Sequence, residues 1–360
     1  MTPETSIRLR CKTALDKGWS LALCRLPGAN AIVQFYSAAQ PILSKLDAAK
    51  FADTQFAFAP YASGNLAYVL SPDITETDYL HSASAAEEKS TTELNWHCVP
   101  STNKPSTYEQ YLNYVNRAIQ LIRKHELAKV VAARCQLVSP TTDMLNTFYR
   151  MCELNKQAYV YLFSSPVSGT WLGSTPELLL SCSEKTIRTV ALAGTKQAAD
   201  TTAWGKKEQD EHGFVEAFID DAFEQLNIQA LTLEDVHEIQ AGNIKHLVSH
   251  FEWCASDDEL RKKFHKLLAL LNPTPAVCGL PPMEASVFIA QHEHMERKFY
   301  SGFNGIVSAH DTHLYVTLRC MEKQPEGIML YAGAGITSDS VAEDEWEETE
   351  RKMQSVYLPA

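Results

Sequence analysis

Residue types suited to binding an anion gather near the end of the chain. Arg319 is expected on a strand, and Gly333 and Gly335 in a loop that offers backbone amides. Glu345 and Glu348 follow, three residues apart on a predicted helix. An arginine and free amides suit an anionic substrate. Carboxylates beside an anion require a cation between them, and hard oxygen ligands favour Mg2+. This part of the chain therefore predicts an enzyme that acts on a small carboxylic acid with Mg2+ as the bridge.

A second acidic pair, Glu208 and Glu211, has the same spacing at the start of another predicted helix, so both side chains face the same way. Together with Glu345 and Glu348 it could hold one Mg2+ from opposite sides, leaving positions for substrate and water. The alternative is that each pair is a solvated helix face, which is the usual role of either pair taken alone.

An acid and a base are available elsewhere in the chain. Lys129 begins an apolar run, where a lysine most often extends to solvent from a strand end. To act as a general base it must lose its proton, which requires burial or nearby positive charge to lower its pKa from about 10.4. Glu177 follows a Ser-Thr-Pro turn and is an ordinary strand-start carboxylate unless an apolar setting keeps it protonated as a general acid. The run from Ala191 ends at Gly194 and Thr195, where the backbone can approach a ligand closely.

Composition excludes several classes of function. The 360 residues carry a formal charge of -12 with a pI near 5.5, which argues against non-specific binding to nucleic acid or to anionic membranes. The nine cysteines form no CxxC pair, which favours reduced thiols over disulfides or a zinc site. We find no signal pattern and no apolar run of membrane-spanning length, so we expect a soluble cytoplasmic protein that does not bind membranes or nucleic acid.

The elements that must position these residues are short strands with single helices between them. Periodicity predicts helices near 108–122, 142–155, 258–271 and 283–298 and one after Glu211, and strands near 20–24, 31–36, 56–61, 66–70, 129–134, 158–164, 169–173, 177–183, 188–193, 301–308, 313–320 and 328–333. The polar stretch 82–101 is predicted to be a surface loop that leads into a helix. There is no strand–helix alternation of a doubly wound fold and no Gly-rich nucleotide loop. The pattern predicts an α+β fold, one large domain of residues 1–360 with extensive antiparallel sheet.

Several of these segments, taken in order, resemble the chorismate-utilising enzymes. The resemblance rests on Lys129-Val-Val-x-x-Arg134, Ser174-Thr-Pro-Glu-Leu-Leu-Leu180, Leu192-Ala-Gly-Thr195, Glu211-His212, Asn272-Pro-Thr-Pro-Ala-Val-Cys-Gly279, Arg297-x-x-Tyr-x-Gly-x-x-Gly305, Leu318-Arg-Cys320, Ala332-Gly-Ala-Gly335 and Glu345-Trp-x-Glu-Thr349. That family includes isochorismate synthase, salicylate synthase, anthranilate synthase component I and aminodeoxychorismate synthase. The resemblance covers residues 105–355 as the family core, with 1–104 as a variable N-terminal part. It implies two large, mainly antiparallel sheets packed together, with helices outside.

The resemblance also implies a role for each site residue. Lys129 and Glu177 would be catalytic, and Glu211 and Glu348 would ligate Mg2+ while Glu208 and Glu345 hold metal-bound waters. The metal would bind the ring carboxylate of chorismate. The residues expected to bind the rest of the substrate are Gly194, Thr195, His246, Arg319, Gly333, Gly335 and Lys352. His246 on its own would be interpreted as structural.

Residues 129 and 193 distinguish the family members. Members that add water resemble this chain in carrying a lysine at position 129, the ammonia-using members usually have glutamine there, and aminodeoxychorismate synthases have a lysine where this chain has Ala193. The resemblance therefore implies water addition at C2, with Lys129 taking the water proton and Glu177 protonating the departing C4 hydroxyl. The short chain favours isochorismate synthase, an isomerase, for menaquinone or siderophore biosynthesis, and we favour menaquinone. Salicylate synthase and a catalytically silent chorismate-binding relative stay open as alternatives. We expect a monomer without a glutaminase subunit.

Overall fold

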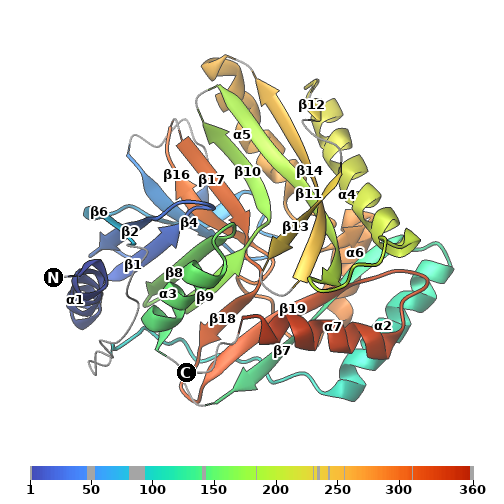
Figure 1. Ribbon diagram of the computed structural model, residues 1–360, viewed down its shortest axis with the longest axis horizontal. Coiled ribbons are helices and arrows are strands. Elements are labelled where there is room, and N and C mark those ends of the chain that lie inside the picture. Colours follow the sequence, from blue (N-terminus) through green and yellow to red (C-terminus); the bar gives the residue numbers. More distant parts are fainter. Residues whose placement is uncertain are drawn as a thin grey trace.

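The protein is built on two large sheets, drawn with their helices in the computed structural model (Figure 1). The structure describes residues 2–46, 53–80, 94–139, 143–183, 185–229, 231–232, 236–241, 244–254, 256–309 and 311–356. A 9-stranded sheet has the order β15-β7-β19-β18-β9-β8-β1-β2-β6, and a 10-stranded sheet has the order β12-β14-β11-β10-β17-β16-β4-β5-β3, with β13 paired to β14. Every pairing among the described strands is antiparallel, as the sequence predicts.

The described elements have the following bounds. The strands of the 9-stranded sheet are β1 (Ser20–Arg25), β2 (Ala31–Ser37), β6 (Ile74–Tyr79), β7 (Lys129–Val138), β8 (Tyr159–Ser165), β9 (Gly169–Thr175), β15 (Gly279–Leu280), β18 (Cys320–Lys323) and β19 (Ile328–Ile336). Those of the 10-stranded sheet are β3 (Ile42–Lys45), β4 (Gln55–Ala59), β5 (Leu66–Leu70), β10 (Leu178–Ser183), β11 (Thr186–Gln197), β12 (Leu231–Thr232), β13 (His237–Ala241), β14 (Ile244–Cys254), β16 (Phe303–Val307) and β17 (Asp311–Val316). The helices are α1 (Pro3–Asp16), α2 (Tyr108–Arg123), α3 (Met144–Leu154), α4 (Lys206–Gln225), α5 (Asp257–Leu271), α6 (Pro282–His292) and α7 (Ala342–Gln354).

An aromatic core joins the two sheets. On β8, Tyr161 and Phe163 face this core while Leu162 between them faces the helices on the other side, because successive side chains of a strand point to opposite faces. From the other sheet, Phe58 of β4 stacks on Phe299 with ring centroids 4.2 Å apart and meets Phe163 edge-on at 4.9 Å. Both faces of β8 are therefore buried, which is why the strand has almost no polar residue at its centre.

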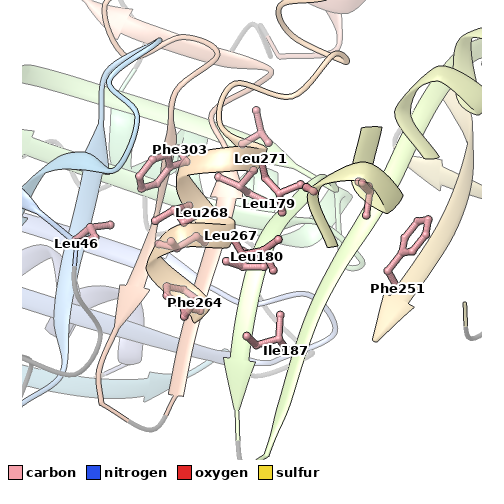
Figure 2. Close-up of a cluster of buried hydrophobic side chains, with 14 of the residues drawn as sticks. Leu46, Leu179, Leu180, Ile187, Phe251, Phe264, Leu267, Leu268, Leu271 and Phe303 are labelled. Carbon is pink, nitrogen blue, oxygen red and sulfur yellow. The ribbon is translucent and has the colours of Figure 1, made fainter. Parts of the chain in front are cut away.

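The helices cover the outer faces of the sheets. The stripe of α5, Phe264, Leu267, Leu268 and Leu271, recurs at three and four residues and packs on Leu180 and its neighbours in the 10-stranded sheet (Figure 2). Burying each of these leucines stabilises the fold by roughly 1.5–3 kcal/mol. Helix α4 covers the same face, α1 and α3 cover the 9-stranded sheet, and α2, α6 and α7 surround the ends of β7 and β19.

The N-terminal part belongs to both sheets. Strands β1, β2 and β6 extend the first sheet from β8, and β3, β4 and β5 extend the second from β16. Helix α1 was not predicted, because a buried arginine, Arg8, and an exposed leucine, Leu9, obscure the helical spacing of its buried apolar residues. The predicted boundary at residue 105 stays a prediction. Among the described helices, none is both long and apolar enough to cross a membrane.

Two predicted elements are wrong in their extent. The strand expected over 313–320 is divided, since β17 ends at Val316 in one sheet and β18 begins at Cys320 in the other. The helix expected over 283–298 ends at His292, because the next residue, Glu293, turns its carboxylate to the backbone N–H of Ala133 and to Arg297. The predicted loop 82–101 does lead into a helix, α2, although residues 81–93 lie outside the described part of the chain.

Candidate active site

A cavity lies where the ends of both sheets meet α4 and α7. Its lining residues are Val131, Pro176, Glu177, Leu192, Ala193, Gly194, Thr195, Glu211, His246, Ala276, Val277, Tyr300, Leu318, Arg319, Tyr331, Ala332, Gly333, Gly335, Glu348 and Lys352. All of the predicted site residues are among them except Lys129, Glu208 and Glu345. The structure thus brings together residues that are widely separated in sequence.

Lys129 lies directly behind the cavity wall. It is the first residue of β7, its side chain is fully buried, and its Nζ atom is 2.8 Å from Oε1 of Glu211, which lines the cavity. The contact is an ion pair that does not meet hydrogen-bond geometry, and among the described residues Nζ has no hydrogen-bond partner. A buried ammonium or amine with unused hydrogen-bonding capacity is a group that a water or a substrate atom would satisfy.

Glu177 has the environment that a general acid requires. It immediately precedes β10, is only 4% exposed, and its Oε1 accepts a long hydrogen bond of 3.4 Å from the Thr274 hydroxyl. Burial raises the pKa of Glu177 from 4.5 to about 7, against smaller opposing effects of Thr274 and of Lys129. A carboxyl group with this pKa is partly protonated near neutral pH, so it can donate a proton there.

Arg319 marks the point where the chain passes from one sheet to the other. It lies between β17 and β18 with φ 44, so the prediction that it is borne on a strand is wrong. The positive φ follows from the sharp change of direction between the two sheets. Burial lowers the pKa of Arg319 to about 10, which still leaves the guanidinium charged at neutral pH.

His246 of β14 fixes the guanidinium of Arg319. Its Nδ1 is 2.8 Å from the carbonyl oxygen of Gly194, which can only accept, so Nδ1 carries the proton and Nε2 accepts from Arg319. The Thr195 hydroxyl lies 3.3 Å from the same Nδ1. Burial and the positive charge of Arg319 hold the pKa of His246 well below its ordinary value. His246 is therefore a neutral acceptor in this site.

Lys352 and the glycines of β19 line a further part of the cavity. The Nζ atom of Lys352 is 2.8 Å from Oε1 of Glu348 and donates to the carbonyl of Gly333 at 2.9 Å. Gly333 and Gly335 lie within β19, which extends to Ile336, so the predicted loop is wrong. A Cβ atom on Gly335 would lie 2.4 Å from Oε1 of Glu211, so a side chain at this position would displace that carboxylate.

Two of the four predicted metal-site glutamates meet at the cavity. Glu211 from α4 and Glu348 from α7 both line it, and each has the Nζ atom of a lysine at 2.8 Å from its Oε1. Within the described ranges, no group of three or more His, Cys, Asp and Glu side chains is arranged to hold a metal ion. The oxygen donors of Glu211 and Glu348 are of the kind that Mg2+ prefers, because this ion is commonly bound by one or two carboxylates and keeps several waters.

The other two glutamates lie outside the cavity wall. Glu345 is buried on α7, only 1% exposed. Glu208 turns back toward the start of α4, where a Cβ atom on the N-cap residue Gly205 would lie 2.7 Å from its Oε2. Of the four predicted glutamates, Glu211 and Glu348 therefore line the cavity, whereas Glu208 and Glu345 do not.

Some residues that hold the cavity walls in place had no role predicted from the sequence. Arg297 forms a bidentate ion pair with Glu293, at 2.7 Å for each bond, and donates to the carbonyls of Val277 and Val131, both cavity residues. Thr274, the partner of Glu177, was likewise given no role. Both residues belong to motifs that resemble the family, but the contacts of Arg297 with Val131 and of Thr274 with Glu177 span long sequence separations that no local pattern shows.

Comparison with known proteins agrees with this architecture. A family model for chorismate binding enzymes matches residues 65–358. An isochorismate synthase of Escherichia coli (strain K12) is 31% identical over 300 residues, covering 77% of this chain and 68% of the relative. A vibriobactin-specific isochorismate synthase of Vibrio cholerae is 28% identical over 265 residues, covering 70% of this chain and 67% of that protein.

The fold has a counterpart among solved structures. The menaquinone-specific isochorismate synthase from Escherichia coli superposes with a TM-score of 0.75 at 20% sequence identity, covering 96% of this chain and 90% of the other. The predicted two-sheet fold and the predicted resemblance are thereby confirmed. The chain belongs to the chorismate-binding enzyme family, and the relatives named above are isochorismate synthases.

Proposed function

We propose that this protein is an isochorismate synthase, which converts chorismate to isochorismate by adding water at C2 and releasing the C4 hydroxyl. The observation that carries the proposal is the meeting of a buried lysine and a buried carboxyl of raised pKa at one cavity. Glu177 has a pKa of about 7, and Lys129 lies behind the same wall beside Glu211. Water addition with loss of water requires one base and one acid, and these are the two groups present.

The proposed proton transfers balance within the site. Lys129 takes a proton from the attacking water as its oxygen bonds to C2 and the ring double bonds shift. Glu177 donates its proton to the C4 oxygen as the C4–O bond breaks, so the hydroxyl leaves as water. The resulting ammonium and carboxylate are reset by proton exchange with solvent, and no oxidant or reductant is needed.

Charge complementarity supports the choice of substrate. Arg319 stays charged, and Lys352 reaches the cavity from α7, so two cations face a dicarboxylate. The guanidinium is fixed by His246, and Lys352 is fixed by Gly333 and Glu348. Groups held in this way keep the substrate oriented at little entropic cost.

Glu211 and Glu348 would hold a Mg2+ ion in this function, with Glu208 and Glu345 next to them on the same helices. A bound Mg2+ would offset the negative charge of the ring carboxylate. Glu211→Gln and Glu348→Gln should each weaken Mg2+ binding, measured by calorimetry without substrate. Glu347→Gln is the matched control, since this carboxylate is 70% exposed on the same helix as Glu348. Unchanged Mg2+ titrations in both site variants would overturn the ligand assignment.

The test of the activity is incubation with chorismate and Mg2+, with and without ammonium, and separation of the products by chromatography. Isochorismate in equilibrium with chorismate, formed whether or not ammonium is present, is the expected result. Salicylate with pyruvate would identify a salicylate synthase, and ammonium-dependent anthranilate would contradict the role of Lys129. Absence of product would identify a chorismate-binding protein without activity.

We also propose that the product serves menaquinone biosynthesis, that Mg2+ is the cofactor, and that the protein acts in the cytoplasm as a monomer without a glutaminase subunit. The Escherichia coli relative that is 31% identical carries the name MenF, which is also the name of the menaquinone-specific enzyme, and this supports the first point. The gene should restore menaquinone synthesis in a bacterium that lacks its own isochorismate synthase. Restoration of siderophore synthesis alone would contradict this placement.

A further inference from the structure

Arg134 connects the strand that carries Lys129 to the helix that carries Glu348. On β7, Val131 lines the cavity, whereas Val130 and Ala132 face the helices that cover the other side. Arg134 lies on the same face of β7 as Val130 and Ala132, because alternate residues of a strand point to the same face. Its side chain is only 1% exposed. It therefore stands on the face of the strand opposite the cavity and does not touch the substrate.

The guanidinium of Arg134 makes three different contacts with α7. It lies 3.6 Å from the centre of the Trp346 ring, its Nε donates to the Thr349 hydroxyl at 2.6 Å, and its NH2 group donates to Glu350. Trp346, Thr349 and Glu350 stand at i, i+3 and i+4, so they form one face of the helix. A planar guanidinium that stacks and donates at the same time restricts the orientation of its partner more strongly than an ammonium would.

The face that Arg134 contacts lies beside the face that enters the cavity. Because an α-helix turns by about 100° per residue, Glu348 and Lys352 project from a direction adjacent to that of Thr349. Apolar packing alone leaves a helix some freedom to rotate about its axis. With side-chain tips about 5–6 Å from the axis, a rotation of roughly 20° moves a carboxylate by about 2 Å. A shift of this size would break the contact of Lys352 with the carbonyl of Gly333 and move Glu348 from its present place at the cavity.

We propose that Arg134 and Thr349 are positioning residues that set the rotation of α7, and thereby hold Glu348 and Lys352 at the cavity. This inference rests on the proposed function, since it assigns Glu348 to metal binding. Trp346 contributes the stacking surface, and Tyr108 and Tyr111 of α2 close its edges with ring centroids at 5.2 and 5.6 Å. Thr349 is fully buried, so its hydroxyl has no role at the protein surface.

The test compares Mg2+ binding to the substrate-free protein, measured by calorimetry, with the kcat and KM for chorismate. Thr349→Val keeps the shape and removes the hydroxyl, while Thr349→Ser keeps the hydroxyl. Arg134→Met keeps the length of the chain without the guanidinium, and Arg188→Met is the control, because the Arg188 side chain is 54% exposed in a pair with Glu252.

Loss of a residue that orients a metal ligand weakens metal binding by roughly 10–100-fold. We expect the affinity for Mg2+ to fall by about tenfold in Thr349→Val and by more in Arg134→Met. The KM for chorismate should rise in parallel. Thr349→Ser and Arg188→Met should match the wild type. Thermal unfolding shows whether each variant is folded under the assay conditions.

Wild-type Mg2+ binding and wild-type KM in a folded Thr349→Val protein would overturn the inference. So would equal losses in the Val and Ser variants, because these would reflect packing and not the hydrogen bond. A wild-type protein that bound no Mg2+ would overturn the inference together with the metal assignment. A wild-type protein that bound Mg2+ but made no isochorismate would overturn the proposed function alone.

Discussion

The imidazole of His246 accepts a hydrogen bond from the guanidinium of Arg319, and its other nitrogen donates to the carbonyl of Gly194 at 2.8 Å. Both ring nitrogens are thus used within the protein. The histidine holds the arginine in place as a neutral group, and the arginine in turn keeps the histidine from taking up a proton. The pair serves to position a positive charge for the substrate.

Replacing His246 by alanine should impair substrate binding. Arg319 would lose its acceptor, and a hydrogen bond to a charged group contributes about 1.5–3 kcal/mol, so the KM for chorismate should rise by roughly tenfold or more while kcat changes less. Steady-state kinetics test this expectation. His313→Ala is the matched control, since His313 pairs with Asp311 on β17 and is absent from the cavity wall. An unchanged KM in His246→Ala would contradict the positioning role.

Lys129→Met should abolish turnover without abolishing ligand binding. The variant keeps the length of the side chain but has no base, and general-base catalysis contributes on the order of 10²–10⁴-fold to rate. Mg2+ binding should be retained, because Glu211 loses the lysine at 2.8 Å that competes for its carboxylate. Kinetics and calorimetry measure the two properties separately. Lys263→Met, at a surface pair with Glu259, is the control. Near-normal kcat in Lys129→Met would exclude Lys129 as the base.

The pKa of Glu177 predicts a falling limb in the pH profile. A general acid works in its protonated form, and burial raises the pKa of this carboxyl to about 7. The part of kcat/KM that depends on Glu177 should therefore decline as pH rises through about 7, and Glu177→Gln should have little activity at any pH. A profile that rises through this range would mean that the carboxylate form is the active one.

The raised pKa of Glu177 should also make the stability of the protein depend on pH. The folded state binds this proton more tightly than the unfolded state, whose carboxyl titrates near 4.5. This pKa difference therefore stabilises the folded state fully below about pH 4.5, and the stabilisation is lost as the pH rises through about 7. Its contribution to the free energy of unfolding is on the order of 3 kcal/mol. Denaturant unfolding at a series of pH values should show this decline in the wild type and a flatter dependence in Glu177→Gln. Equal pH dependence in both proteins would contradict it.

Gly335→Ala should affect function more than stability. The new methyl group would lie 2.4 Å from Oε1 of Glu211, at the mobile end of a side chain, so the carboxylate rather than the backbone must move. We expect weaker Mg2+ binding and loss of most activity with little change in thermal unfolding. Gly213→Ala is the control, because a Cβ atom there meets nothing within 4 Å. Alanine in a helix interior stabilises the helix by about 1 kcal/mol relative to glycine. Equal activity in the two variants would show that the space beside Glu211 is not needed.

The parts of the fold with a regular pattern were predictable from sequence. The short apolar run of β8 and the stripe of α5 follow from which side chains must be buried, so the strand near 158–164 and the helix near 258–271 are confirmed. The division of the predicted strand at Arg319 was not predictable in this way, because Val316 and Cys320 are both buried and the local pattern continues across the break. Only pairing with distant strands shows that the chain changes sheets there.

The candidate site was predictable in its residue types but not in its contacts. The motifs indicated Lys129, Glu177 and Glu211 from their chemistry, and the structure places them around one cavity. The raised pKa of Glu177 depends on burial supplied by the fold as a whole. The contacts of Arg134 with Trp346 and Thr349 join two motifs more than two hundred residues apart, which no local pattern can reveal.

The most direct test of the central claim is turnover of chorismate with Mg2+ in water enriched in heavy oxygen, with wild type and Lys129→Met compared side by side. We expect isochorismate from the wild type with one solvent-derived oxygen at C2, and no product from the Lys129→Met variant although it still binds Mg2+. Isochorismate that carries no solvent oxygen, or equal labelling by the variant, would contradict water addition with Lys129 as the base.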